Sequence, residues 1–534
     1  MASPSEDYQP TEAGPHHRRW ERTYLAEGLD GVTETRTNAY VQVGTGLNRM
    51  DDTGAWVAAE AKFELIDSAA VARTTAHQVV IKGPADTVPV DVLTPDGQRL
   101  TSRVLGLGYY SPKTGQSILL AEPRPVDGHL IGQNEVLFEN AFDGGFRADL
   151  RYTVTLAGLE QDVVLMEQPP LPEDAGIADD EEMRLEVITE FLAAPKPVIT
   201  NQTLGPARHG NTGLTEPEFV DHTLSFGQMQ MGIGAALDFD RPGPEALVPV
   251  APIQKRWETI DERNILFEAA DLATVTPFLK QLPARGGASL RKPERQVRIA
   301  SRTGLVPATR APRRSQLFAG TGSGARSGFV MDFLLVNASQ TNFTFKGDTT
   351  YHISSALELF ETTTLEGGAV IKYSRDAPGN PVWVKVRGPF LCRTSSYRPA
   401  VFTGFDDDSV GEIISGSNGN PTGYYAAYPI WFYGSGANMT LEHVRMHNCW
   451  VAASFYWYTG HRLRHIQAID CGYMTLAYGC DLKVHNALAH RLESHITYAY
   501  GSPVEVQHLT AHRVGNMLRS DTLSGVAVRS KAGA

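Results

Sequence analysis

The sequence predicts an all-β protein in which an N-terminal antiparallel β-sandwich-like region is followed by a right-handed parallel β-helix. The first observation is composition. The 534 residues include 50 glycines and 32 prolines, which favour many turns, and long amphipathic helical stretches are scarce. The second observation is a short repeat near the C-terminus. The third is strand-like alternation between turn signals in the N-terminal part.

The repeat lies in the C-terminal part of the chain. Residues 439–456 align with 461–478 at a shift of 22, and further shifts of 20 and 22 continue the pattern to residue 520. Such a period suits one coil of a parallel β-solenoid with three short strands and three turns. One coil cannot bury its apolar side chains alone, so we expect equivalent residues of stacked coils to lie about 4.8 Å apart.

This register predicts which side chains stack on one another. We expect an inward ladder of Ser454, Leu476, Ile496 and Leu518, and a ladder of stacked rings of Tyr456, Tyr478 and Tyr498. Two polar ladders at the turns would consist of His443, His465 and His485, and of Asn448, Asp470, His490 and His512. Cys449 and Cys471 share a repeat position, and we expect buried thiols that touch across adjacent coils.

The N-terminal part begins with residues 1–19, which contain no long apolar run, so we expect a disordered tail without a signal peptide. Residues 20–170 alternate in the manner of strands. Turn signals recur between these strands at Asp51-Asp52-Thr53-Gly54, Pro95-Asp96-Gly97 and Lys113-Thr114-Gly115. This pattern predicts a β-sandwich-like domain built from hairpins.

The remaining chain divides into three parts. Residues 171–283 predict further strands with one short helix, as either a continuation of the β region or a second small β domain. Residues 284–328 are basic and rich in Gly, Pro and Ser, and we interpret them as an interdomain linker, with a nucleic-acid or anionic-surface patch as the alternative. Residues 329–534 form the expected β-helix, which we expect to be truncated at the C-terminus because no polar cap follows its last coil.

Two stretches resemble known proteins. Residues 135–172, with an Asn-Ala-Phe turn before an Asp-Leu-Arg-Tyr strand, resemble a β-rich segment of large secreted or surface bacterial proteins, some of which carry RHS/YD repeats. The phrase TTLEGGAVIKY (363–373), followed by VWVKVRGPFLC (382–392), is similar to the opening coils of pectate-lyase-like parallel β-helix domains in such proteins. The resemblance implies a fold and a place outside the cell or at the cell surface, without an established activity. The chain as given shows no signal peptide, so a cytoplasmic place stays open.

Charge and hydropathy narrow the classes of partner. The formal net charge of −12 at pH 7 argues against a general affinity for nucleic acid. The chain has no run of 18 apolar residues, so the sequence predicts no membrane-spanning helix. We expect a monomer or part of a longer chain, with a polysaccharide as the candidate partner.

An aromatic run indicates where a polysaccharide would bind. Flat exposed rings stack on sugars, and a long solenoid flank presents rings at regular spacing. We select four glycan-binding candidates: Tyr425, Trp431, Tyr433 and Trp457. The alternative is that these rings only fill the core or the loops of the solenoid.

Three acidic side chains are candidate metal ligands: Asp406, Asp408 and Glu412. Carboxylates this close in sequence repel one another unless a cation lies between them, and Ca²⁺ prefers six to eight oxygen ligands. EF-hand spacing is absent, so a solvated acidic loop is the alternative. We expect no other cofactor.

Enzyme signatures are mostly missing, because the chain has no GxSxG, HExxH, P-loop or CxxC motif. Three residues are candidate catalytic residues: Asp470 and His490 of the second polar ladder, and Arg491 next to His490. Two functions follow. The first is a non-enzymatic extracellular or cell-surface protein whose β-helix is a rigid stalk or an adhesive, glycan-binding surface. The alternative is a polysaccharide lyase or glycoside hydrolase on the same scaffold.

Overall fold

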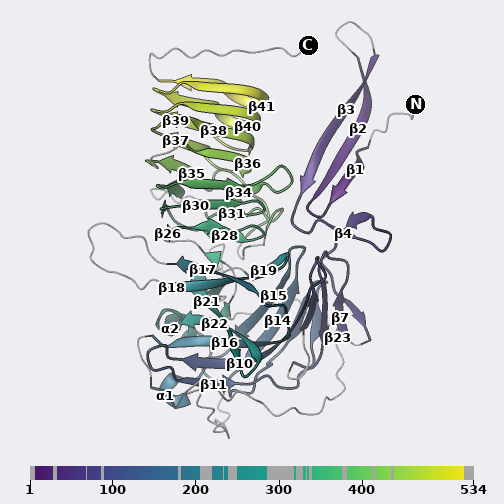
Figure 1. Ribbon diagram of the computed structural model, residues 1–534, viewed down its shortest axis with the longest axis vertical. Helices are drawn as coiled ribbons and strands as arrows, with labels where there is room; N and C mark the ends of the chain where they lie inside the picture. Colours follow the sequence, from purple (N-terminus) through teal and green to yellow (C-terminus); the bar gives the residue numbers. More distant parts are fainter. Residues whose placement is uncertain are drawn as a thin grey trace.

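The computed structural model shows a nearly all-β protein, with 60% strand and 3% helix, in which a parallel β-solenoid follows antiparallel N-terminal sheets (Figure 1). No helix among the described residues is long and apolar enough to cross a membrane. The structure describes residues 7–27, 33–67, 69–85, 90–178, 182–204, 219–231, 234–238, 249–285, 318–319, 329–331, 334–335, 340–375, 382–411, 414, 417–434 and 438–521.

The chain begins with an antiparallel arm of three strands, β1 (Gln9–Gly14), β2 (His17–Glu27) and β3 (Thr33–Val43). The arm rises beside the solenoid (Figure 1). Strand β1 corrects the prediction that residues 1–19 form a disordered tail. Its segment is polar and has no strand pattern of its own, but backbone pairing with β2 satisfies its hydrogen-bonding groups.

Side-chain contacts fix the arm against the first coils of the solenoid. The ring of His17 stacks on that of Tyr397 with centroids 3.8 Å apart. The Tyr397 hydroxyl donates to Glu12 at 3.2 Å, across 385 positions of sequence. Just after the arm, Thr45 Oγ1 donates to the Asp348 carboxylate at 2.7 Å.

A 16-stranded sheet dominates the N-terminal region. Its strands up to residue 165 are β6 (Glu64–Ile66), β7 (Ala69–Ala72), β8 (Gln78–Lys82), β9 (Val90–Leu93), β10 (Arg99–Tyr110), β11 (Ser117–Ala121), β12 (His129–Ile131), β13 (Glu135–Phe138), β14 (Ala148–Val154) and β15 (Leu159–Leu165). Its later strands are β16 (Arg184–Ala193), β20 (Gly234–Asp238), β21 (Pro249–Ile260), β22 (Arg263–Asp271), β23 (Phe318–Ala319) and β24 (Phe329–Met331). The smaller elements are β4 (Asn48–Met50), β5 (Trp56–Ala58), β17 (Val198–Leu204), β18 (Phe219–Phe226), β19 (Met229–Met231), α1 (Pro172–Ala175) and α2 (Leu272–Leu279).

Strands from both of the sequence-defined N-terminal regions share this sheet. Strand β10 pairs with β16, and β16 pairs with β22, so the strands after residue 184 continue the sheet that begins before residue 170. The three turn signals close the hairpins β4–β5, β9–β10 and β10–β11. Most of the basic linker, residues 284–328, lies outside the described residues, and β23 within it pairs with β12.

The solenoid has about seven turns. Its main sheet consists of β25 (Leu334–Leu335), β26 (Gln340–Thr341), β28 (Thr350–Ile353), β29 (Leu357–Phe360), β31 (Val370–Tyr373), β32 (Trp383–Val386), β34 (Ala400–Gly404), β35 (Tyr428–Tyr433), β36 (Thr440–His447), β37 (Val451–Tyr456), β38 (His461–Ile469), β39 (Tyr473–Tyr478), β40 (Leu482–Tyr500) and β41 (Val504–Ser520). A second sheet consists of β27 (Thr344–Phe345), β30 (Thr363–Glu366) and β33 (Phe390–Arg393). Equivalent strands of successive coils pair in parallel, as the sequence repeat predicts.

The later coils bend at fixed corners where one residue adopts a left-handed backbone conformation. These residues form three columns along the solenoid: His443, His465, Asn486 and His508; Asn448, Asp470, Arg491 and Arg513; and Gly434, Trp457, Gly479 and Gly501. Glycine and short polar residues tolerate positive φ best, and larger side chains are strained there. Three such corners in each coil agree with the expected three short strands and three turns.

The register corrects the expected shift of 20 in the third coil. His461 pairs with Leu482, a shift of 21, whereas Tyr473 pairs with His495, a shift of 22. One extra residue therefore lies between the two halves of β40. Because the first half of this coil is shifted by 21 and not by 20, Arg491 takes the corner position of Asp470 in the next coil, and His490 lies in the neighbouring column.

Two expected ladders are present in the neighbouring coils. The rings of Tyr456 and Tyr478 stack with centroids 5.0 Å apart, although the next ring in the stack is that of Tyr500 and not Tyr498. The Sγ atoms of Cys449 and Cys471 lie 3.3 Å apart as free, buried thiols.

The expected inward ladder is wrong in part. Ile496 lies in the solenoid core, but Leu476 belongs to a separate cluster on the outer side of the sheet. Phe455 and Ala477 fill the core at the adjacent positions. Alternate residues of a strand point to opposite faces, so a misassignment by one residue moves a side chain from one face to the other.

These positions predict different costs for the same substitution. We expect Ile496→Asp to destabilise the protein by on the order of 4 kcal/mol, because it places an unpaired carboxylate in the core. Leu476→Asp should cost about 1–2 kcal/mol, because the carboxylate can reach water at the outer face. Chemical denaturation of the full chain measures both, with Met517→Asp at an exposed position as the control. Equal costs at the two positions would contradict the assigned faces.

Candidate functional site

The outer side of one solenoid sheet carries a second apolar cluster, separate from the core. Val451, Tyr473 and Leu476 are buried there, and three partly buried tyrosines pack against them: Tyr428, Tyr456 and Tyr498. The cluster belongs to β35, β37, β39 and the second half of β40, which are neighbours in the sheet. We call this surface the aromatic face.

A column of tyrosines runs along the aromatic face parallel to the solenoid axis. It starts at Tyr433, whose ring lies 5.5 Å from that of Tyr456. The rings of Tyr456 and Tyr478 are 5.0 Å apart and inclined by 13°, and those of Tyr478 and Tyr500 are 4.6 Å apart and inclined by 4°. Rings stacked in this way cover each other's flat faces and leave their edges and hydroxyls outward.

Charged side chains at the border of the aromatic face are engaged within the protein. The Lys385 ammonium lies 4.3 Å from the Trp431 ring centroid and donates to Glu358 at 3.2 Å. Arg387 lies 4.6 Å from the Tyr433 ring centroid and also donates to Glu358. Both cations are thus held by protein partners, although together they carry one more charge than Glu358 balances.

The four predicted glycan-binding residues occupy different environments. Trp431 and Tyr433 are partly buried on the aromatic face, and Trp457 is 44% exposed at a corner next to it. Tyr425 is wrong as a glycan platform, because it is fully buried in the solenoid core and its ring has no free face. Sequence reasoning missed Trp450, which is 36% exposed at the opposite corner.

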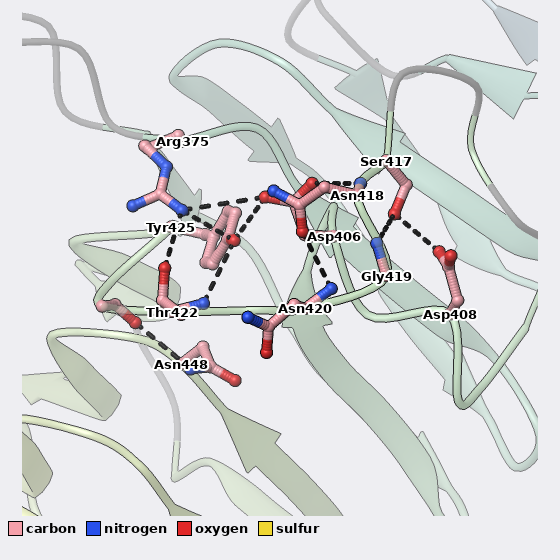
Figure 2. Close-up of polar contacts among 11 residues, drawn as sticks. Arg375, Asp406, Asp408, Ser417, Asn418, Gly419, Asn420, Thr422, Tyr425 and Asn448 are labelled. Atoms are coloured by element: carbon pink, nitrogen blue, oxygen red, sulfur yellow. Dashed lines mark hydrogen bonds and ion pairs between the residues drawn. The ribbon is translucent and has the colours of Figure 1, made fainter. Parts of the chain in front are cut away.

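The buried Tyr425 belongs to a polar network that organises the loop between β34 and β35 (Figure 2). Its hydroxyl donates to the Asp406 carboxylate at 2.5 Å and accepts from Arg375 at 2.9 Å. The Arg375 guanidinium also lies 3.7 Å from Asp406. Asp406 accepts from the main-chain N–H of Asn418 at 3.0 Å, and Asp408 accepts from Ser417 Oγ at 2.6 Å.

Asp407, between these two carboxylates, is also engaged by protein donors. It accepts from Thr403 Oγ1 at 2.7 Å and from the main-chain N–H of Ser409 at 3.0 Å. Burial alone would raise the pKa of Asp407, but the hydrogen bonds from Ser409 and Thr403 outweigh it and lower the pKa below its ordinary value. The three carboxylates thus tie the loop together through hydrogen bonds.

The predicted calcium ligands Asp406 and Asp408 therefore have protein donors, and Glu412 lies outside the described residues. Within the described part of the chain, no group of three or more His, Cys, Asp or Glu side chains is arranged to hold a metal ion. The calcium site stays a prediction.

The three predicted catalytic residues meet at one corner of the solenoid. Arg491 makes a bidentate ion pair with Asp470, with Nε 2.5 Å from Oδ1, and its Nη1 donates to His490 Nε2 at 2.9 Å. The hydrogen bonds from Arg491 lower the pKa of Asp470, and those to Asp470 raise the pKa of Arg491. Each group is thereby stabilised in its charged form, which suits a link between coils better than proton transfer.

His447 lies near this corner, in the same column as His490 two coils earlier. Burial lowers the pKa of His447, and the nearby carboxylates of Asp407 and Asp470 oppose the shift without reversing it. The folded protein therefore disfavours protonation of this imidazole relative to an unfolded chain.

A comparison of the chain with protein-family models found no match, and comparisons with curated proteins and with solved structures found none either. The parallel solenoid implied by the sequence resemblance is present in the structure, whereas its assignment to a family has no support from a match.

The lowered pKa of His447 predicts an acid-sensitive stability. A base whose pKa is lower in the folded state stabilises fully above its ordinary value of about 6.5 and loses that stability as the pH falls. We expect the melting temperature to fall between pH 7 and pH 5, and less steeply in His447→Gln. His352→Gln is the comparison variant for the slope of melting temperature against pH, because His352 is a second histidine whose pKa is lowered by burial, to about 4. An unchanged slope in His447→Gln would show that this histidine is not held neutral.

Proposed function

We propose that the protein is a non-enzymatic extracellular or cell-surface protein whose solenoid binds a polysaccharide on its aromatic face. One observation carries the proposal: an apolar cluster of Val451, Tyr473 and Leu476 with surrounding tyrosines lies on the outside of the sheet, apart from the core. These three residues are themselves buried, and the partly exposed rings around them, with Tyr500 39% exposed, form an aromatic surface of the kind that is typical of binding sites.

The chemistry of the aromatic face suits sugars. Exposed tryptophan rings contact the C–H faces of a sugar, whereas the stacked tyrosines, whose faces cover one another, offer ring edges and hydroxyls that hydrogen-bond to its hydroxyls. Tyr478 and Tyr500 hold their rings 4.6 Å apart, and strand pairing fixes that spacing. A face held in place by the backbone binds an extended polymer with little loss of its own conformational entropy.

The solenoid also suits a rigid stalk. Each coil pairs with its neighbours through main-chain hydrogen bonds, and the apolar residues of all coils form one continuous core. Stability in such a scaffold comes from contacts between adjacent coils, so it extends without a change of packing.

The alternative, a polysaccharide lyase or glycoside hydrolase, depends on the corner of Asp470, His490 and Arg491. A hydrolase needs a carboxylic acid whose pKa is raised, so that it is protonated at working pH. The pKa values of Asp407 and Asp470 are both lowered, so neither suits that role. The paired Arg491 is likewise a poor base. These features favour binding over catalysis.

The binding function predicts retention of the full chain on at least one insoluble polysaccharide in a pull-down panel. Tyr500→Ala removes the most exposed ring of the tyrosine column and should weaken binding two- to fivefold, or about 0.4–1 kcal/mol. Tyr40→Ala is the control, because this exposed ring lies on the arm and not on the aromatic face.

Two outcomes would count against this function. If no polysaccharide of the panel retains the protein, the proposed function is wrong. If Tyr500→Ala and Tyr40→Ala weaken binding equally, the aromatic face is not the contact surface. Release of reducing or unsaturated ends from a bound polymer would favour the enzymatic alternative.

A further inference from the structure

Two tryptophans stand at the two ends of the same strand on the aromatic face. Trp450 directly precedes β37 and Trp457 directly follows it. The Trp450 ring makes an edge contact with Tyr473 at 5.2 Å, and the Trp457 ring makes one with Tyr478 at 5.1 Å. Tyr473 and Tyr478 are the first and last residues of β39. The tryptophans therefore bracket the face across the width of the sheet.

Each tryptophan lies against a glycine of the next coil. A Cβ atom on Gly472 would come within 2.4 Å of the Trp450 ring, and one on Gly479 within 2.8 Å of the Trp457 ring. Gly472 and Gly479 occupy the same repeat positions as the two tryptophans, one coil later. The coil that follows thus leaves room for both indoles, and 36% of Trp450 and 44% of Trp457 stay exposed.

Trp457 also breaks a column of glycines. Gly434, Gly479 and Gly501 hold the equivalent corner in the other coils, all with positive φ, whereas Trp457 adopts φ 62° in a region that disfavours bulky side chains. The next residue, Tyr458, has φ 64° and is 44% exposed. Strain of this kind is found at binding sites, where it is retained for what the side chain contacts.

Ring orientation decides along which direction a sugar chain would lie. In the axial column, Tyr456, Tyr478 and Tyr500 cover one another's faces, so a chain along the axis would meet ring edges. The indoles at the two ends of β37 lie outside that stack. They stand seven residues apart, which is roughly 23 Å along an extended strand. A chain laid along β37 would therefore reach both indoles and cross the tyrosine edges between them.

The cations next to the face are engaged by protein partners, which favours a neutral ligand. Lys385 and Arg387 share the carboxylate of Glu358 at one end and also lie against aromatic rings, and Arg519 is paired with Asp521 at the other end at 3.2 Å. The hydroxyl of Tyr424, whose ring contacts Trp450, donates to Glu493. An acidic polymer would have to compete with these pairs for its cations.

We propose that Trp450 and Trp457 are the two platforms of a subsite for a neutral, extended polysaccharide that runs along β37, across the solenoid axis. This inference rests on the proposed function and adds the position, the direction and the charge class of the ligand. The bound segment spans several sugar rings, because it must reach from one indole to the other.

The test uses the full chain and the insoluble neutral polymers cellulose, chitin, xylan and mixed-linkage β-glucan, with alginate and polygalacturonate as acidic counterparts. Calorimetry then measures the hexasaccharide and the disaccharide of the best neutral binder. We expect Trp450→Ala and Trp457→Gly each to weaken hexasaccharide binding about tenfold. The double variant should bind the hexasaccharide no better than the unsubstituted protein binds the disaccharide.

A matched pair of substitutions separates binding from folding. Trp457→Ala and Trp457→Gly remove the same ring, so they should lose the same affinity, but glycine relieves the left-handed strain and should melt at the higher temperature. Trp450→Ala supplies an independent readout at a position without positive φ, and Tyr40→Ala on the arm is the control for loss of an exposed ring.

The outcomes separate this inference from the function on which it rests. If the protein binds none of the polymers, the proposed function itself is wrong. Binding to a neutral polymer that survives both tryptophan substitutions, or binding confined to the acidic polymers, would overturn the two-platform subsite and leave polysaccharide binding in place.

Discussion

The stacking of coils in register is the constraint on which the C-terminal half of the protein depends. Each coil must bend at the same places as its neighbours, so each corner column repeatedly requires a left-handed backbone. Asn448, Asp470 and Arg491 meet this requirement with polar side chains, and the ion pair between Asp470 and Arg491 also links two coils. Between the corners, alternation sends one set of side chains into the core and the other to the aromatic face.

The sequence was informative where the chain repeats itself without insertion. Pairing of β36 with β38 follows the predicted shift of 22, and the thiols of Cys449 and Cys471 touch as expected. The next coil carries one additional residue between its two halves, and no turn motif marks it. Its first half is shifted by 21 and not by the expected 20, so alignment by residue type placed His490 after Asp470, whereas the backbone places Arg491 there.

The candidate site was harder to predict, because exposure depends on irregular segments. Tyr425 looked like part of an aromatic surface, but the loop between β34 and β35 folds it into the core and directs its hydroxyl to Asp406. Trp450 has no aromatic counterpart in the next coil, since Gly472 stands there, so it left no periodic signal. Its exposure follows from that glycine, and only the packing of the two coils reveals it.

The docking of the N-terminal arm has a consequence for how the chain folds. Glu12 and Tyr397 bond across 385 positions, and His17 stacks on the same tyrosine. The arm is synthesised before the solenoid, yet the surface that receives it exists only after the first coils have formed. Contacts of such high contact order slow folding, because a long loop must close before they can form. Until then, the arm lacks these contacts, and its edge strands β1 and β3, which pair only with β2, are open to unwanted strand pairing.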